Sequence, residues 1–513
     1  MFAVVLVAIF LLHAPLLGLP YFWDEAGYYI PAARDLLLTG SVIPHSTPSN
    51  AHPPLVMAYL AGGWKVMGFS IFVTRSLMLL VAAFSLLGVF RLARRAANFQ
   101  VAIAATVCTA LYPVFFAQST MAHVDLAAAG LTLWGLEAYL GERRPATVVW
   151  FSLAVLAKET AVLAPLTLLA WEVSCPWIAR LFQLQLCLSE RRRRFSKALL
   201  MPVAALSAWY AFHYWRTGYV FGNPEFFRYN VQSTMSPLRM VLALGMRLWQ
   251  VFGYMHLWVL MILMIWAMTR PATVDGNHER QRIDISVQCV FGVLILGYVV
   301  AMAVVGGAVL ARYMLPVVPL VIIVAVSTLW RRVRRWPVLI AAVCVAFVGA
   351  LFLNPPYGFS PEDNLAYRDY VVMHQAAESV LETRYPEARV LTAWPASDEV
   401  SRPYLGYVTR PLRVVRIEDF TAENLLGAAQ ERARFQVALV FSTKYEPVAP
   451  LLGGWRTWER LKKRFFGFHR DLPPEIAAQI LGGRVVFTAA SRGQWVAVIE
   501  LERALDAQLR RPY

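Results

Sequence analysis

Charged residues are scarce in this chain, and acidic residues are scarcer than basic ones. Only 16% of the 513 residues are Asp, Glu, Lys or Arg, whereas 58% are hydrophobic, and the mean hydropathy is +0.51. A soluble domain contains about 45–50% apolar residues, so the composition excludes a soluble protein and predicts an integral membrane protein. The formal net charge is +16. The arginines lie in short loops between apolar runs, so we interpret the charge as orienting the protein in the membrane and not as a nucleic-acid site.

Cysteine motifs and nucleotide motifs are also absent. The five cysteines all precede residue 350 and none forms a C-x-x-C pair, which argues against a disulfide framework and a zinc–cysteine site. There is no G-x-G-x-x-G stretch or P-loop, so no nucleotide site is indicated. No internal repeat or low-complexity segment is visible.

Long apolar runs recur as far as residue 353, and a membrane span needs about 20 such residues. We predict about eleven transmembrane helices, with the run 146–173 divided into two short helices by Lys158-Glu159. The first run lacks a basic leader and a convincing cleavage site, so we interpret it as a retained signal anchor. The predicted spans are residues 1–19, 71–90, 99–117, 121–140, 146–157, 159–173, 197–215, 250–268, 286–306, 312–330 and 337–353.

Clusters of basic residues follow every second predicted helix. The clusters are Arg91 with Arg94 and Arg95, Arg143 with Arg144, Arg191 to Arg194 with Lys197, Arg270 with Arg280 and Arg282, and Arg331 to Arg335. With eleven helices all of these loops lie on one side, which the positive-inside rule makes the cytoplasmic side. The run of arginines at 191–194 then needs no role beyond orientation and contact with anionic lipids.

The tail after residue 353 is more polar and carries short β-branched runs. We predict strands at 388–393, 412–417, 435–441, 484–487 and 495–499, with helical segments at 421–432 and 474–482. Strands that alternate with helices indicate an α/β domain. The expected architecture is therefore a polytopic α-helical membrane module, residues 1–353, followed by an extracytoplasmic C-terminal α/β domain, residues 354–513.

Polar residues from separate loops fall on the side opposite the arginines. Asp24-Glu25 follows the first apolar run, where acids are costly unless they are paired, hydrated or used. The alternative is that Asp24 caps a helix with Glu25 in its first turn. In the same loop, residues 20–70, His52 precedes Pro53-Pro54 at a rigid bend, or it is a loop histidine of no consequence. We expect the segment 55–69 to lie along the membrane interface.

This pattern resembles the GT-C membrane glycosyltransferases. An acidic pair after the first helix and an outer loop with His-Pro-Pro-Leu are similar to the protein O-mannosyltransferase and aminoarabinose-transferase branch. Further similar stretches are Gln118-Ser119 followed by Asp125, residues 218–225, Arg312 to Pro316, Trp394-Pro395 and residues 405–408. The resemblance covers nearly the whole chain. Where His52 stands, the aminoarabinose branch has a lysine, so its role as a phosphate clamp is the less secure part.

The resemblance implies transfer of a sugar from a polyprenyl-phosphate carrier to an acceptor hydroxyl, with inversion, on the outer face of the cytoplasmic membrane. Asp24 is the candidate base, Glu25 orients Asp24 or the acceptor, and Asp125 is the second carboxylate. The candidates for binding the donor phosphate are His52, Lys158, Arg228, Arg312 and its neighbour Tyr313.

Each of these residues has a plainer alternative. Asp125 is otherwise a buried acid paired with His123 or Lys158. Lys158 and Glu159 are otherwise an ion pair that joins two helix ends. Arg228 is otherwise part of a solvated loop.

Two other classes of protein compete with the transferase. A transporter or flippase of a lipid-linked glycan would place its charges near the midplane and often shows inverted repeats. A non-catalytic assembly or sensor protein would leave the acidic pair and the Arg-Tyr turn unexplained. No metal-ligand spacing is visible, so no cofactor is expected, and a divalent ion held by Asp24 and Asp125 is the alternative left open. The sequence does not identify the sugar, and lipid, glycan and protein acceptors all remain open.

Overall fold

The computed structural model describes residues 1–181, 191–222, 224, 236–305, 307–447, 450–451 and 455–502. The chain divides into two compact units, Met1–Leu17 with Ala32–Leu353, and Gly18–Pro31 with Asn354–Tyr513. We refer to them as the membrane unit and the C-terminal unit. The segment Gly18–Pro31, which carries Asp24-Glu25, groups with the tail and not with the helices that flank it in the sequence.

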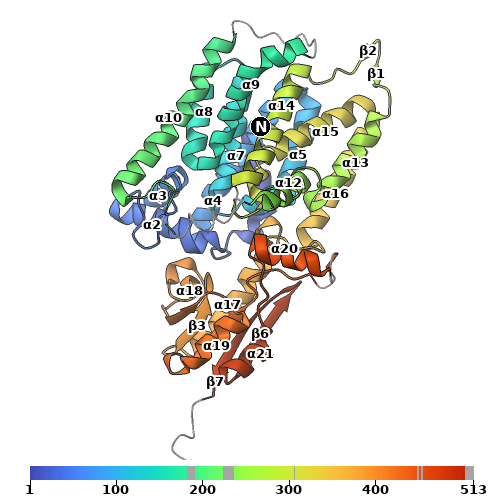
Figure 1. The fold of residues 1–513 in the computed structure, drawn as a ribbon. Coiled ribbons are helices and arrows are strands. Elements are labelled where there is room, and N and C mark those ends of the chain that lie inside the picture. The colour runs from blue at the N-terminus through green and yellow to red at the C-terminus, as the bar shows by residue number, and fades with distance from the viewer. Residues whose placement is uncertain are drawn as a thin grey trace, which may run out of the picture. The chain divides into compact units, whose positions relative to one another are not determined.

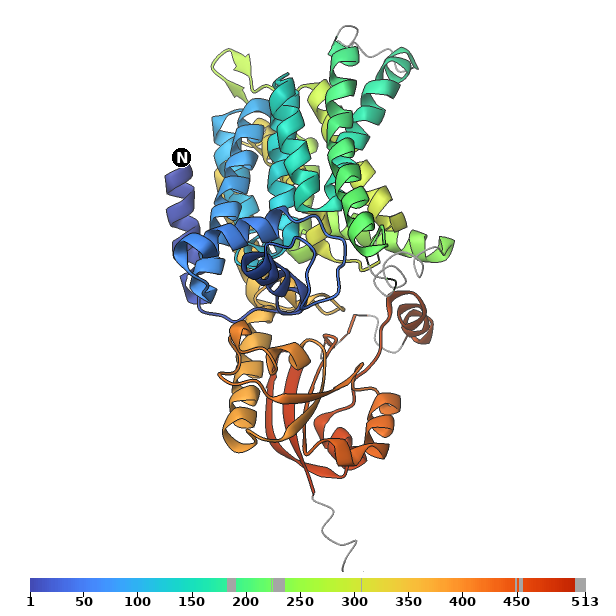
Figure 2. The same ribbon diagram turned by 90° about the vertical axis from the view of Figure 1, so that its left-hand side faces the viewer.

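The membrane unit is built from helices and one short antiparallel hairpin, β1 (Val274–Asp275) with β2 (His278–Glu279) (Figures 1 and 2). Its described helices are α1 (Phe2–His13), α2 (Ile30–Thr39), α3 (Leu55–Met67), α4 (Ile71–Ala96), α5 (Phe99–Leu111), α6 (Pro113–Gln118), α7 (Val124–Leu140), α8 (Arg144–Ala157), α9 (Leu163–Leu181), α10 (Arg191–Thr217), α12 (Pro237–Phe252), α13 (Leu257–Met268), α14 (Ile285–Val305), α15 (Val318–Arg332) and α16 (Trp336–Phe352).

Several predicted spans are interrupted, and each break has a local cause. Pro113 holds the preceding Tyr112 extended and so separates α5 from α6. Lys158 is extended, with φ −152° and ψ 135°, and ends α8, as the sequence predicts. Residues 216–249 fall between two predicted spans, yet α12 begins within them at Pro237. The predicted span 250–268 is broken by the turn before α13, where His256 has a φ of 65°.

Within the described residues, four helical stretches are long and apolar enough to cross a membrane: Ile71–Ala96, Phe195–Thr217, Pro237–Met268 and Ile285–Val305. Five more apolar helices are shorter: Phe2–Leu16, Leu55–Met67, Phe99–Leu111, Arg144–Ala157 and Trp336–Phe352. The count of eleven spans therefore stays a prediction.

Four of the five basic loops lie at one end of the membrane unit. The Glu137 carboxylate on α7 accepts from Arg95 after α4 and forms an ion pair with Arg143 before α8. The Arg280 guanidinium donates to the Trp330 carbonyl of α15, and the Trp330 indole donates to Gln100 of α5. These contacts join loops that are far apart in the sequence, as a shared cytoplasmic side requires. The side chains of Arg191 to Arg194 lie outside the described residues.

The C-terminal unit contains a five-stranded mixed sheet in the order β4-β3-β5-β7-β6. β3 pairs in parallel with β4 and β5, whereas β7 is antiparallel to β5 and β6. The strands, β3 (Arg389–Ala393), β4 (Arg413–Ile417), β5 (Val437–Phe441), β6 (Gly483–Ser491) and β7 (Gln494–Leu501), coincide with the predicted runs. The helices are α17 (Ala366–Arg384), α18 (Ala396–Glu399), α19 (Ala422–Gln430), α20 (Arg456–Phe466) and α21 (Pro474–Leu481).

The segment Gly18–Pro31 is fixed to this sheet domain by its backbone and its aromatic rings. The Tyr407 hydroxyl donates to the Tyr21 carbonyl at 3.1 Å, and the Tyr21 amide lies 3.4 Å from the Leu405 carbonyl. The ring of Trp23 meets the edge of Trp394, with ring centroids 5.3 Å apart. Such edge-to-face pairs add to the free energy of burial, so the tail orders the backbone that carries the acidic pair.

Candidate functional site

Asp125 and Lys158 form the centre of a buried ionic cluster in the membrane unit. Asp125 lies in the first turn of α7 and Lys158 follows the last residue of α8, which brings Lys158 Nζ within 2.5 Å of Asp125 Oδ1. Arg312 Nε lies 3.2 Å from Asp125 Oδ2. All three side chains are at least 95% buried. The interpretation of Asp125 as a buried, paired acid is therefore confirmed, with Lys158 and Arg312 as its partners.

His123 joins Arg312 to the turn before α7. Arg312 Nη1 lies 3.1 Å from His123 Nδ1, and the same ring nitrogen lies 2.8 Å from Gln118 Oε1. His123 is also close enough to Arg75 and Lys158 for electrostatic interaction. Arg75, in the second turn of α4, is fully buried and donates to the Thr120 carbonyl at 2.8 Å. The turn between α6 and α7 is thus surrounded by cationic side chains from three other segments.

Three cationic side chains from different segments lie close to the Tyr313 ring. Lys158 Nζ lies 3.8 Å from the ring centroid, and the guanidinium carbons of Arg247 and Arg312 lie at 5.5 Å and 5.8 Å. These distances fall within the range of cation–π attraction. Arg247 comes from α12 and donates to the Leu310 carbonyl at 2.7 Å, which fixes the turn that carries Arg312 and Tyr313.

His52 has a different partner from the one a phosphate clamp would need. Its Nδ1 lies 3.0 Å from Glu159 Oε2, and the indole of Trp209 donates to the neighbouring Ala51 carbonyl. Lys158 and Glu159 do not pair with each other, so the interpretation of these two residues as a helix-end ion pair is wrong. Because Lys158 is extended, its side chain and that of Glu159 point to separate partners.

The arrangement can bind a multivalent oxyanion. Lys158, Arg312, Arg75 and Arg247 reach one region from four different segments, and guanidinium and ammonium donors are the groups that recognise phosphate. Asp125 contacts two of these cations, Lys158 and Arg312, and so fixes their positions. Arg228, the remaining predicted phosphate ligand, lies outside the described residues.

The acidic pair, in the C-terminal unit, divides its roles between the two carboxylates. Glu25 is fully buried, and its Oε2 accepts a hydrogen bond from the Phe22 amide at 2.9 Å. Asp24 is half-buried at the start of the π-helical turn Glu25–Tyr29, and its side chain makes no capping hydrogen bond. Asp24 thus stands at the N-cap position with Glu25 in the first turn, as the capping alternative predicts, but the carboxylate that accepts from the backbone is that of Glu25.

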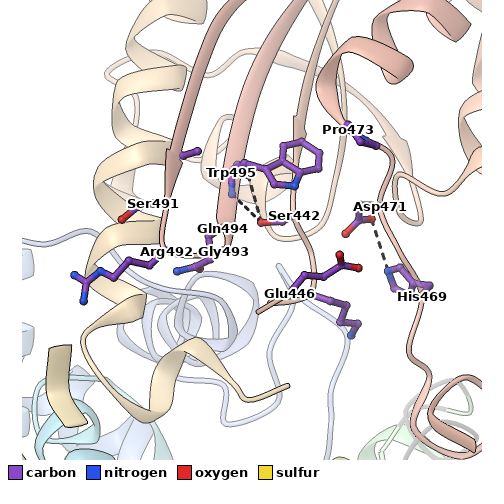
Figure 3. A pocket seen from close by; sticks show the side chains of 12 residues that line it. Ser442, Glu446, His469, Asp471, Pro473, Ser491, Arg492, Gly493, Gln494 and Trp495 are labelled. Atoms are coloured by element: carbon purple, nitrogen blue, oxygen red, sulfur yellow. Dashed lines mark hydrogen bonds and ion pairs between the residues drawn. The ribbon is translucent and has the colours of Figure 1, made fainter. Parts of the chain in front are cut away.

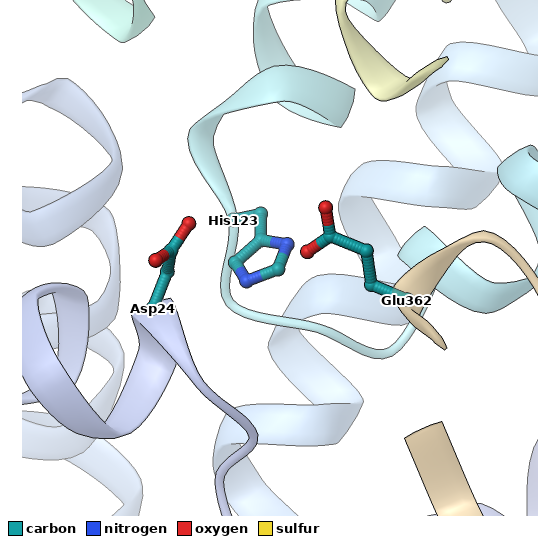
Figure 4. Close-up of side chains that lie close together, drawn as sticks. All are labelled: Asp24, His123 and Glu362. Carbon is teal, nitrogen blue, oxygen red and sulfur yellow. The ribbon is translucent and has the colours of Figure 1, made fainter. Parts of the chain in front are cut away.

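A second acid lies beside Asp24 in the same unit. Glu362, in the turn that precedes α17, is buried, and one of its carboxylate oxygens lies within 4.8 Å of one from Asp24 (Figure 4). His123, also drawn in Figure 4, belongs to the membrane unit. Two carboxylate oxygens within this distance can both contact one hydroxyl group.

The C-terminal unit also contains a recess of about 360 Å³ beside β7, lined by Lys444, His469, Asp471 and Trp495 among others (Figure 3). Asp471 accepts from the amides of Thr443 and Phe420, and Ser442 bonds with the Trp495 backbone. Burial lowers the pKa of Lys444. Because local backbone groups already use Asp471, we do not assign this recess a role in the reaction.

Sequence reasoning missed three residues of these sites. Arg75 is a lone charge inside a predicted span, which is itself a signal of function. Arg247 falls in the region that the sequence predicts as loop, where its helical position was not visible. Glu362 offered no signal, because its approach to Asp24 depends on a fold contact across more than 300 positions of the chain.

The fold is that of the GT-C membrane glycosyltransferases, as the sequence resemblance predicts. Residues 51–215 match the family model described as dolichyl-phosphate-mannose-protein mannosyltransferase. Two crystal structures of ArnT from Cupriavidus metallidurans are similar over 97% of both chains at 14% identity. The TM-scores are 0.55 for the apo protein and 0.54 for the complex with undecaprenyl phosphate. No curated protein sequence matches the chain.

Proposed function

We propose that this chain is a glycosyltransferase that moves a sugar from a polyprenyl-phosphate donor to an acceptor hydroxyl, with inversion. The convergence of Lys158, Arg312 and Arg247 around Tyr313 is the observation that carries the proposal, and Arg75 adds a cation near His123, which contacts Arg312. Buried cations that are already oriented stabilise the charge that develops on a departing phosphate. The likeness to a fold that binds undecaprenyl phosphate in ArnT supports this assignment.

In this mechanism Lys158 and Arg312 bind the phosphate of the donor, and Asp125 positions them. The sequence places Asp125 among the catalytic carboxylates, but its contacts with Lys158 and Arg312 favour a positioning role. Tyr313 contributes the ring face on which Lys158 rests. His52 acts indirectly, by holding Glu159, which follows Lys158 in the chain.

Asp24 is the proposed base, because it occupies the place of the acidic pair in the GT-C resemblance and its side chain is half-buried. Its carboxylate takes the proton from the acceptor hydroxyl while the hydroxyl oxygen bonds to the anomeric carbon. The bond from that carbon to the phosphate oxygen breaks in the same step, and polyprenyl phosphate leaves. Attack from the face opposite the leaving group gives inversion. Glu25 holds the Asp24 turn, and Glu362 is a further candidate for orienting the hydroxyl.

The proposed location is the cytoplasmic membrane, with the arginine-rich end of the membrane unit inside and the reaction outside. The C-terminal domain, residues 354–513, would then lie outside as well. A lipid, glycan or protein acceptor fits this location equally well. No cofactor takes part in the proposed transfer step.

Binding and transfer can be tested separately with the full-length protein in nanodiscs and undecaprenyl phosphate as the probe. Arg312→Gln should weaken binding about tenfold or more, because a hydrogen bond to a charged group contributes about 1.5–3 kcal/mol. Asp24→Asn should bind as wild type does. The matched control is Arg94→Gln, at an exposed arginine of α4. Equal affinities for the wild type, Arg312→Gln and Arg94→Gln would exclude the proposed phosphate site.

A further inference from the structure

A second buried cluster lies in the C-terminal unit and consists of residues that the proposed reaction does not use. His374 and Glu378 are one turn apart on the same face of α17, and Glu399 is the last residue of α18. Their side chains are 0–1% exposed. His374 Nδ1 lies 2.8 Å from Glu399 Oε2 and 3.7 Å from Glu378 Oε1. One potential ligand atom from each residue lies within 4.8 Å of the other two.

The cluster has more acceptors than the protein satisfies. Both carboxylate oxygens of Glu378, Oε1 of Glu399 and Nε2 of His374 are buried without a hydrogen-bond partner. Across the described parts of the chain, neither glutamate forms an ion pair with a lysine or an arginine, and His374 is their common partner. A buried carboxylate without compensation is strongly destabilising, so this site requires either a proton or a cation.

The surroundings hold the three groups rigidly. The His374 ring stacks on Tyr370, with centroids 3.8 Å apart, and meets the edge of Phe441 at 4.8 Å. Glu378 is fixed by the helix, and Glu399 follows β3 by way of the short helix α18. The Tyr370 hydroxyl is buried beside Glu399. Ligands fixed on regular elements in a dry site favour one coordination geometry.

We propose that His374, Glu378 and Glu399 form a structural site for a divalent first-row transition metal ion, with Zn²⁺ as the best fit. One imidazole and two carboxylates match the nitrogen and oxygen ligands that Zn²⁺ accepts. Two carboxylates also balance the charge of a divalent ion in a buried site. The ion would join α17 to α18, next to the Trp394 that packs on Trp23 beside the acidic pair. This proposal is independent of the transfer reaction.

The test measures the metal content of the full-length protein after incubation with ZnCl₂ and removal of unbound ion. Wild type should retain about one Zn²⁺ per chain more than Glu378→Gln, as expected for a closed site. Glu423→Gln, at an exposed glutamate of α19 in the same unit, should match wild type. Zinc that is bound elsewhere contributes equally to wild type and to Glu378→Gln, so it cancels when the two zinc contents are subtracted. Equal zinc content in wild type and Glu378→Gln would overturn the proposal.

A second measurement on the unmodified protein guards against a variant that fails to fold. A chelator should lower the Tm of wild type, and ZnCl₂ should restore it, because a ligand that binds the folded state stabilises it. Glu378→Gln should show neither change. If neither chelator nor ZnCl₂ changes the Tm of wild type, the cluster is an acid pair that shares a proton, and the metal site is excluded. Neither result depends on sugar transfer, so the two proposals fail separately.

Discussion

The two buried ionic clusters of this protein are built in opposite ways. In the membrane unit each central carboxylate contacts a basic side chain: Asp125 contacts Lys158 and Arg312, and Glu159 contacts His52. In the C-terminal unit, two fully buried glutamates share His374 as their one basic partner among the described side chains. The first cluster gathers donors for an anion, whereas the second gathers acceptors for a cation.

Asp125 and Asp24, the two acids that stand out in the sequence, have different surroundings in the structure. Asp125 has the position expected of a catalytic acid, but its partners use it to hold two cations in place. Asp24 is partly exposed, which suits the proton transfer that we propose for it. Deep burial and contact with two cations therefore distinguish Asp125, the proposed positioning acid, from Asp24, the proposed base.

The largest expected effect is the loss of transfer on replacing the proposed base. Asp24→Asn should reduce product about 10²–10⁴-fold, the usual contribution of general base catalysis, while the protein folds and still binds undecaprenyl phosphate. Mass spectrometry of envelope glycolipids and glycoproteins, from cells with wild type or the variant, measures this. If Asp24→Asn gave as much product as wild type, Asp24 would not be the base, and another acid would have to take that role.

A smaller but still large effect is expected on stability when Asp125 is replaced. Asp125→Asn removes the carboxylate that both Lys158 and Arg312 contact, and breaking a buried pair costs about 3–5 kcal/mol. Undecaprenyl phosphate should restore part of the lost Tm, because its phosphate supplies negative charge to the same cations. Thermal unfolding with and without the lipid gives both values. A variant as stable as wild type, with an unchanged lipid response, would contradict the positioning role.

Much of this fold could be predicted from local patterns. The five strands of the C-terminal sheet coincide with β-branched runs, because a run buried in a sheet carries its own signal. The break at Lys158 was also predicted from a local pattern, because the charges of Lys158 and Glu159 interrupt an apolar run. The helix α12 was not predicted, because its arginines Arg239 and Arg247 make it look like a polar loop. Both guanidinium groups are buried and donate to backbone carbonyls, Arg239 to Gly307 and Arg247 to Leu310. Only the folded chain brings these carbonyls close to the arginines.

The sequence predicts which residues belong to the site, but not which of their side chains contact each other. Asp125, Lys158 and Arg312 were identified by charge in apolar surroundings, and the structure brings them together. That His52 binds Glu159, and that Glu25 rather than Asp24 accepts from the backbone, depends on side-chain directions that the sequence does not encode locally. His374 and Glu378 have helical i, i+4 spacing, but the third member, Glu399, lies on another element.

A third effect tests whether the acidic pair is held by the C-terminal unit. A Cβ added at Gly27 would lie 2.6–2.8 Å from the Trp394 indole, so Gly27→Ala should force the ring to move. Overpacking of this kind costs about 1–3 kcal/mol. Gly62→Ala, on α3 of the membrane unit, meets no atom within 4 Å and serves as the control. Thermal unfolding of both variants measures the difference, and equal Tm values would argue against this packing.

The smallest effect distinguishes a proton from a metal in the second cluster. Burial and the adjacent Glu399 raise the pKa of Glu378 well above its usual range. Between the unfolded pKa of about 4.3 and this raised value, the metal-free folded state binds more protons than the unfolded state. Its free energy of unfolding should therefore fall as the pH rises, by at most about 1.4 kcal/mol per pH unit from this group. Zinc should abolish this slope, because metal binding keeps the carboxylate deprotonated in the folded state, as it already is in the unfolded state. Denaturant unfolding at several pH values, with chelator or with ZnCl₂, compares wild type with Glu378→Gln, which should lack this slope in both conditions. A wild-type slope that is identical with chelator and with zinc would leave the proton as the occupant and remove the contrast between the two clusters.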